Sequence, residues 1–189
     1  SNTYSILSYL RKANVKATFF VVPNRSEECA ATLRAIAADG HAIGVHSASH
    51  EYEKIYASVE AFLDDFYEAW DIIRDSTGIS TEIFRFPGGS NNGSSYVVNG
   101  IIDEMEERGF QYFDWNVSSG DGSELTTTEN IIDNICSNVG VPENPVVLMH
   151  DGRGKNATLA ALPTVLEYLS DNGYEFCSLD KNVEAVHYR

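Results

Sequence analysis

The sequence alternates between segments with helical spacing and short apolar segments typical of buried strands, and this alternation limits the fold more than any other feature. Residues 4–13 carry apolar side chains on one helical face and end at Asn14, a residue suited to cap a helix C-terminus. The apolar segment 17–22 stops at Pro23, which predicts a buried parallel strand. The repeated order strand, helix, strand predicts right-handed βαβ units and a parallel sheet, open or closed as a barrel.

The pattern extends to the end of the chain without a linker or a low-complexity segment, so residues 1–189 are predicted to form a single domain. Because the alternation starts on a helix, the opening strand of such a fold is expected to be missing and the domain to be partial. Helices are predicted over residues 4–13, 27–39, 58–76, 97–108, 128–137 and 159–170, and strands over 17–22, 41–45, 83–86, 111–117, 146–149 and 175–179.

Charge and composition exclude several classes of partner. There are 28 acidic and 13 basic side chains, a formal net charge of −15, whereas nucleic acids and anionic membranes are bound by clustered Lys and Arg. No apolar segment is long enough to span a bilayer. The three cysteines, Cys29, Cys136 and Cys177, are far apart and odd in number, which predicts buried thiols rather than a disulfide framework or a metal site.

Polar and titratable side chains follow the predicted strands at their carboxyl ends, where α/β proteins assemble their sites. His46 and His50 are spaced i, i+4, so a single helical turn would place both imidazoles on one face, an arrangement that suits a divalent ion. The pair alone also fits two solvated loop histidines, and His150 alone fits a half-buried histidine bonded to a carbonyl group. Their joint placement with Arg85 and Asp121 at successive strand ends favours a site.

Four motifs in this order resemble those of the polysaccharide deacetylases of carbohydrate esterase family four, especially the peptidoglycan and chitin-oligomer deacetylases of Gram-positive bacteria. They are H-S-x-x-H at 46–50, R-F-P-G-G at 85–89, D-W-N-V-x-S-G-D at 114–121 and V-L-M-H-D at 147–151. The resemblance covers nearly the whole chain. It implies a distorted (β/α) barrel and metal-assisted removal of acetyl groups from N-acetyl amino sugars in a glycan.

The resemblance also implies where the metal and the reacting carbonyl would lie. His46 and His50 match the two histidines that hold the metal, usually zinc, and Ser47 matches a residue whose hydroxyl braces the loop. The metal would lower the pKa of a bound water and polarise the amide carbonyl. Gly88 matches the position whose backbone N–H helps to hold the oxyanion.

The resemblance places the general acid and its partner later in the chain. His150 matches the general acid that protonates the leaving amine, and Asp121 matches the carboxylate that pairs with this histidine and keeps it charged. Arg85 matches the residue that orients the catalytic base. Trp115 and Leu148 would line the slot for the acetyl methyl group. The resemblance therefore predicts that His150 faces the 46/50 pair across a cleft.

One departure from the family is large. The family opens with a strand that carries T-F-D-D-G, whose aspartates are the general base and the third metal ligand, and no such segment occurs in the sequence. The only Asp-Asp pair, Asp64 and Asp65, fits the polar face of a surface helix. We therefore expect a fragment of a longer secreted or cell-surface protein, weak or inactive on its own.

Two other classes of function stay open at this point. One is a carbohydrate-binding pseudoenzyme, whose cleft holds glycan without chemistry. The other is a purely structural α/β domain whose histidines are polar loop residues. For the deacetylase, the substrate could be peptidoglycan, chitin oligomers or an exopolysaccharide, and the sequence assigns no oligomeric state.

Overall fold

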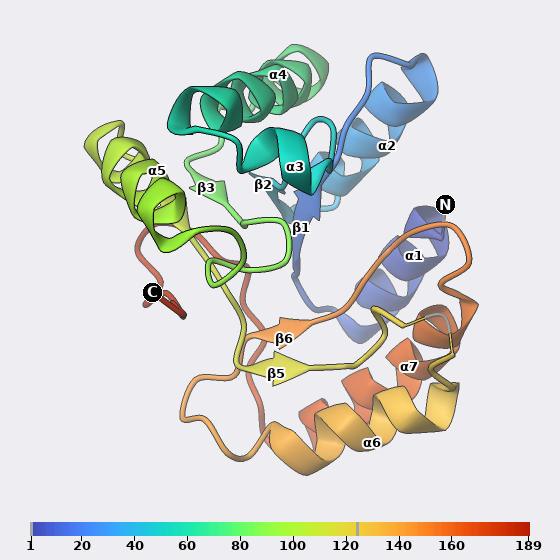
Figure 1. Cartoon of the computed structure of the whole chain (residues 1–189). Helices are drawn as coiled ribbons and strands as arrows, with labels where there is room; N and C mark the ends of the chain where they lie inside the picture. Colours follow the sequence, from blue (N-terminus) through green and yellow to red (C-terminus); the bar gives the residue numbers. More distant parts are fainter. Residues whose placement is uncertain (1, 124) are drawn as a thin grey trace. The chain divides into compact units, whose positions relative to one another are not determined.

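The computed structural model describes residues 2–123 and 125–189 (Figure 1). The chain divides into two compact units, which are taken in turn below. One comprises Ala17–Asp114 and Ser178–Arg189, and we call it the four-stranded unit; the other comprises Ser1–Lys16 and Trp115–Cys177, and we call it the two-stranded unit. The single-domain organisation over 1–189 stays a prediction.

The four-stranded unit contains a parallel sheet with the strand order β1-β2-β3-β4. Helices connect successive strands, as the alternating sequence pattern predicts, and the sheet buries Val45, Phe84 and Phe86 almost completely. The elements are β1 (Thr18–Val21), α2 (Glu27–Ala38), β2 (Ala42–Val45), α3 (Tyr52–Ile55), α4 (Val59–Thr77), β3 (Ile83–Phe84), α5 (Ser95–Glu107) and β4 (Gln111–Tyr112).

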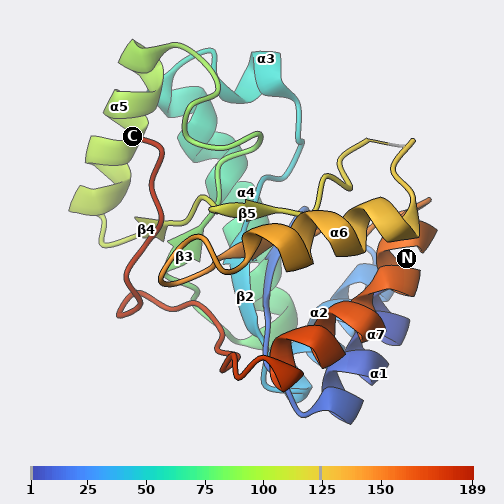
Figure 2. The same ribbon diagram turned by 90° about the horizontal axis from the view of Figure 1, so that it is seen from below.

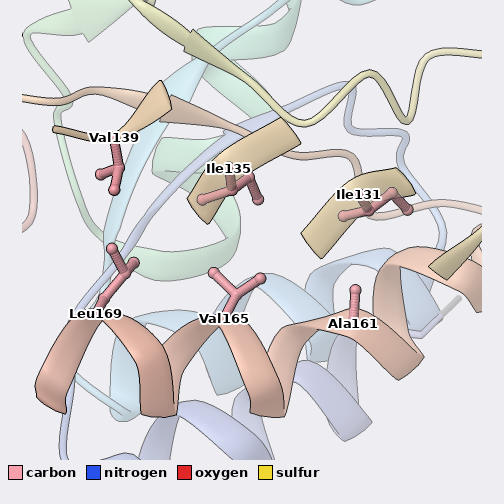
Figure 3. Packing of buried hydrophobic residues seen from close by; sticks show 6 residues of the cluster. All are labelled: Ile131, Ile135, Val139, Ala161, Val165 and Leu169. Carbon is pink, nitrogen blue, oxygen red and sulfur yellow. The ribbon is translucent and has the colours of Figure 1, made fainter. Parts of the chain in front are cut away.

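The two-stranded unit pairs β5 (Val117–Ser118) with β6 (Val147–Leu148) in parallel. Its helices are α1 (Thr3–Ala13), α6 (Thr128–Asn138) and α7 (Asn156–Asp171), and α7 packs against both of the others (Figures 1 and 2). Apolar side chains fill the seam between α6 and α7, as Figure 3 shows. This cluster consists of Ile131, Ile135, Val139, Ala161, Val165 and Leu169.

Helix ends fall where the sequence places its capping residues. The Ser26 hydroxyl accepts a hydrogen bond from the Cys29 backbone N–H at 3.2 Å, which satisfies a donor at the start of α2. Asn14 has the left-handed conformation, with φ of 56°, and ends α1 as predicted. None of the helices in the described part of the chain has both the length and the apolarity that a membrane crossing requires.

Three sequence predictions about the fold are wrong. The strand predicted over 111–117 is two strands, β4 and β5, in different sheets, and between them the Asp114 backbone N–H donates to the Val186 carbonyl rather than to a strand. No strand forms over 175–179. The thiols are free, as expected, but they are not buried as predicted: Cys29 and Cys136 are half-buried and Cys177 is exposed.

Candidate functional site

The histidine loop, residues 46–50, follows β2 in the four-stranded unit. The His46 backbone N–H donates to the Val21 carbonyl at 3.0 Å, so the chain leaves the sheet only after His46. The His46 Nδ1 lies 2.8 Å from the Arg85 carbonyl oxygen. Because a carbonyl oxygen only accepts, Nδ1 carries the proton and Nε2 carries the lone pair of the neutral ring. The ring centroids of His46 and His50 lie 5.2 Å apart.

The loop is not the helical turn that the i, i+4 spacing predicts. No helix forms over 46–50, and His50 has a positive φ of 56°, which is uncommon for a residue with a Cβ. The His50 backbone N–H donates to the Ser47 hydroxyl at 2.8 Å, which closes the loop on itself. The imidazoles are therefore brought together by a compact loop rather than by a helix face.

Asp65 corrects a second prediction. It was expected on the polar face of a surface helix with Asp64, and Asp64 is indeed exposed, but Asp65 is only 3% exposed. Burial by itself would raise the pKa of Asp65, yet hydrogen bonds from the histidine loop outweigh burial and lower it below its usual value. The carboxylate is therefore an ionised acceptor beneath the loop.

Arg85 and Gly88 follow β3 in the same unit. The Arg85 guanidinium is buried and donates from Nε to the Phe113 carbonyl at 2.8 Å and from Nη2 to the Asp114 carbonyl at 3.1 Å. Burial lowers the pKa of Arg85 to about 10, so the group stays charged at neutral pH. Gly88 has φ of 76° and follows Pro87, which fits a turn in which only glycine is comfortable.

Alanine at position 88 is expected to be costly. A Cβ at Gly88 would lie 2.5 Å from Asn92 Nδ2 and 3.2 Å from Tyr52 Cε1, in addition to the left-handed backbone. Gly78 is a matched control, because it has the same φ of 76° and nothing within 4 Å of its Cβ position. We expect Gly78→Ala to lower the free energy of unfolding by about 1–2 kcal/mol and Gly88→Ala to lower it by about 1 kcal/mol more, because the Asn92 and Tyr52 side chains must move aside. Urea titration of both variants measures the difference, and equal losses would contradict the close contact.

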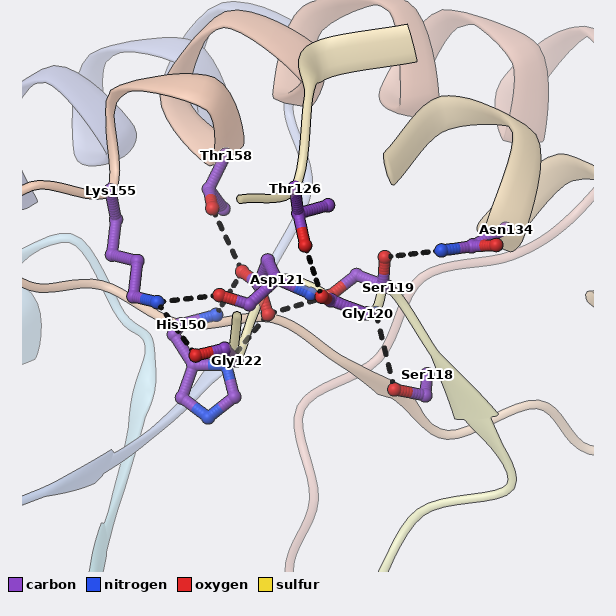
Figure 4. Close-up of polar contacts among 10 residues, drawn as sticks. All are labelled: Ser118, Ser119, Gly120, Asp121, Gly122, Thr126, Asn134, His150, Lys155 and Thr158. Carbon is purple, nitrogen blue, oxygen red and sulfur yellow. Dashed lines mark hydrogen bonds and ion pairs between the residues drawn. The ribbon is translucent and has the colours of Figure 1, made fainter. Parts of the chain in front are cut away.

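Asp121 and His150 form a pair in the two-stranded unit (Figure 4). His150 Nδ1 lies 2.6 Å from Asp121 Oδ1, and the His150 backbone N–H donates to Oδ2 at 2.7 Å. The hydroxyls of Ser119 and Thr158 donate to the same carboxylate at 2.7 and 2.8 Å, and Lys155 Nζ donates to the Asp121 carbonyl at 2.5 Å. The aspartate is only 2% exposed, whereas nearly half of the His150 side chain is exposed.

Asp121 is the ionised, buried partner of this pair. Burial would raise the pKa of Asp121, but the hydrogen bonds from His150, Ser119 and Thr158 hold it at about 2. The carboxylate thus accepts from Nδ1, and the ring presents Nε2 away from the cluster (Figure 4). Sequence reasoning found Asp121 and His150 but gave no role to Ser119, although it lies within the motif at 114–121, and it missed Thr158 and Lys155, which lie in no motif.

Trp115 and Leu148 belong to the same unit. Leu148 is the last residue of β6, pairs with Ser118 of β5 and is half-buried, and Trp115 lies two residues before β5. The predicted site residues thus fall into two groups, one in each unit. His46, His50, Arg85 and Gly88 form one group, and Trp115, Asp121, Leu148 and His150 form the other. The meeting of the two groups at one cleft stays a prediction.

The donor set of the histidine loop fits part of a zinc site. A histidine that binds a metal usually donates its other ring N–H to a carbonyl or carboxylate, and His46 does so to Arg85. Two imidazole nitrogens are a common part of a zinc ligand set. Within residues 2–123 and 125–189, no group of three or more His, Cys, Asp or Glu side chains is arranged to hold a metal ion. His46 and His50 therefore fit as two ligands of an open site.

Comparison with known proteins agrees with these motifs. The sequence pattern of the family described as polysaccharide deacetylase matches residues 1–112. A peptidoglycan-N-acetylglucosamine deacetylase of Bacillus cereus is 30% identical over 179 residues, which cover 92% of this chain and 63% of that protein. The chain spans less than two thirds of the length of the first such curated relatives.

Solved structures show the same fold. The catalytic domain of a peptidoglycan N-acetylglucosamine deacetylase from Eubacterium rectale matches with a TM-score of 0.93 and 37% identity, covering 100% of this chain and 87% of that one. A Streptococcus mutans CE4 esterase matches with a TM-score of 0.86 and 30% identity, covering 94% and 80%. The predicted α/β fold of the deacetylase type is confirmed. The chain belongs to the polysaccharide deacetylase family, carbohydrate esterase family four.

Proposed function

We propose that the protein removes acetyl groups from N-acetyl amino sugars of a glycan in a metal-dependent hydrolysis. The observation that carries the proposal is the buried Asp121 carboxylate bonded to the exposed imidazole of His150, since this arrangement prepares a histidine to deliver a proton. The histidine loop supports it with two imidazoles whose geometry suits a divalent ion. The relatives described above are named peptidoglycan N-acetylglucosamine deacetylases, which favours peptidoglycan as the glycan.

Each residue has a defined part in the proposed reaction. His46 and His50 would hold zinc, which when bound lowers the pKa of water and polarises a carbonyl. The Gly88 backbone N–H would donate to the amide oxygen as negative charge builds on it. His150 would donate its Nε2 proton to the leaving nitrogen, while Asp121 accepts from Nδ1 and fixes the ring.

The remaining predicted residues would shape and orient the site. Trp115 and Leu148 would line the slot for the acetyl methyl group. Arg85 would orient the catalytic base by a charge-assisted hydrogen bond. Because these roles need both groups of residues, the proposal includes their convergence at one cleft.

The 189-residue chain by itself is proposed to be a weak enzyme. Its only Asp-Asp pair lies on α4, where Asp64 is exposed and Asp65 is held by the histidine loop. The described residues thus supply no pair of aspartates in the role that the family gives to T-F-D-D-G. Loss of a positioned base typically lowers a rate by about 10²–10⁴.

Acetate release from N-acetylglucosamine oligomers tests the proposal. We expect the full-length gene product with Zn²⁺ to release acetate, and His46→Ala in the same protein to abolish both stoichiometric zinc binding and acetate release. The 189-residue chain, assayed alongside, should be slower by the factor given above. Glycan binding without acetate release by the full-length product would support a carbohydrate-binding pseudoenzyme instead. If the full-length product binds neither zinc nor glycan, the result would support a purely structural α/β domain.

A further inference from the structure

Asp65 occupies an unusual place for a carboxylate. It lies on the buried face of α4 with Phe62, Phe66 and Ala69, and it is 3% exposed. A charged group in such a place needs several hydrogen bonds, because burial removes its water. The partners that Asp65 takes therefore show what the residue does.

The hydrogen bonds that the Asp65 carboxylate accepts come from the histidine loop. Asp65 Oδ2 accepts from the Ser47 hydroxyl at 2.5 Å and from the Ala48 backbone N–H at 2.8 Å, and Oδ1 accepts from the Ser49 backbone N–H at 2.9 Å. The Ser47 hydroxyl in turn accepts from the His50 backbone N–H. One carboxylate thus fixes, directly or through one hydroxyl, every residue between the two imidazoles.

The two imidazoles are anchored in different ways. The His46 ring is bonded directly to the Arg85 carbonyl. The His50 ring contacts the rings of His46 at 5.2 Å and Tyr52 at 5.4 Å, and within the described part of the chain it makes no hydrogen bond. Its position depends on the backbone of the loop, and that backbone is left-handed at His50, a conformation unfavourable for a residue with a Cβ. The bonds to Asp65 and Ser47 offset this cost.

We propose that Asp65 is a positioning residue that sets the place of the His50 imidazole relative to that of His46. Its importance for metal binding rests on the proposed function, but its effect on the loop does not. The proposal makes an asymmetric prediction: without Asp65, His50 moves or becomes disordered, whereas His46 stays on the Arg85 carbonyl.

The test replaces Asp65 with asparagine in the 189-residue chain, with Asp64→Asn as a matched control one residue away on the exposed side of α4. Asparagine has a single acceptor oxygen, so it cannot accept all three bonds. We expect amide hydrogen exchange at Ala48, Ser49 and His50 to become at least about tenfold faster. Zn²⁺ affinity, measured by calorimetry, should fall about 10–100-fold, as for other residues that hold metal ligands. Asp64→Asn should match the wild type in both measurements.

A second variant keeps the test decisive if Asp65→Asn folds poorly. Ser47→Ala removes the hydroxyl that links Asp65 to the His50 amide but leaves the bonds of Asp65 to the Ala48 and Ser49 amides, so exchange should accelerate at the His50 amide while the Ala48 and Ser49 amides stay protected. In either variant, imidazole NMR signals should shift for His50 and remain for His46. A folded Asp65→Asn protein with wild-type exchange over 48–50 would overturn the proposal.

The outcomes also separate this proposal from the proposed function. If wild-type Zn²⁺ binding does not depend on His46 and His50, the metal-site proposal fails, and the exchange data still decide the role of Asp65. If wild-type binding does depend on them but Asp65→Asn binds Zn²⁺ equally well, the positioning proposal fails alone. A drop in melting temperature without a change in Zn²⁺ affinity would reduce Asp65 to a stabilising residue and also overturn the proposal.

Discussion

Replacing His150 with alanine in the full-length gene product is expected to lower kcat for acetate release by about 10²–10⁴. His150 is exposed at Nε2 and held at Nδ1 by Asp121, so its removal deletes a proton donor without opening the core. KM should change little, because a proton donor acts mainly in the transition state. Steady-state kinetics with N-acetylglucosamine oligomers measures both constants.

The matched control is His187→Ala, which removes an exposed histidine of the four-stranded unit that packs on Tyr112. It should leave kcat and KM near their wild-type values. Wild-type kcat in His150→Ala would remove His150 from the chemistry, and an increase in KM alone would make it a binding residue.

Asp121→Asn is expected to lower the free energy of unfolding by about 2–3 kcal/mol at pH 7. The carboxylate accepts from both the Nδ1–H and the backbone N–H of His150, and asparagine offers one acceptor oxygen for the two donors. One buried donor is left without an acceptor. Chemical denaturation measures the loss, and Asp133→Asn on the exposed side of α6 is a control with the same chemistry.

The difference between wild type and Asp121→Asn should also depend on pH. The pKa of Asp121 is about 2 in the folded protein and near 3.8 in the unfolded chain. Because the folded value is the lower one, its stabilising contribution is complete above about pH 4 and is lost as the pH falls toward 2. This loss amounts to about 2 kcal/mol. A difference that stays constant between pH 5 and pH 2 would contradict an ionised Asp121.

The elements that the sequence predicts well have local causes. Ser26 and Asn14 mark helix ends through hydrogen bonds and backbone conformations that depend on neighbouring residues only. The strand predicted over 111–117 fails for a nonlocal reason. Buried Asp114 accepts from Ser90 and from the Tyr188 backbone, and these partners lie 24 and 74 residues away. No periodicity within a short window reveals such partners.

The candidate site also combines residues that local motifs predict with a residue whose role depends on a distant segment of the chain. Motifs name His46, His50, Asp121 and His150, but the shape of the histidine loop depends on a carboxylate from another element. A signal for Asp65 was present: it stands three residues after Phe62 and four before Ala69, the spacing of the buried helix face. Because Asp65 is charged, it was predicted to be exposed, since buried carboxylates are rare unless hydrogen-bond or ion-pair partners are supplied.

Because Asp65 accepts hydrogen bonds from main-chain N–H groups, it limits which substitutions the histidine loop can accept during evolution. The carboxylate accepts from the amide hydrogens of both Ala48 and Ser49, and Ala48 contributes nothing else, so the side chain at position 48 can be exchanged without disturbing these hydrogen bonds. Proline is excluded at both positions, because it has no amide hydrogen. The side chain at position 48 can therefore vary, while the hydrogen bonds of the loop to Asp65 keep the spacing of the two imidazoles.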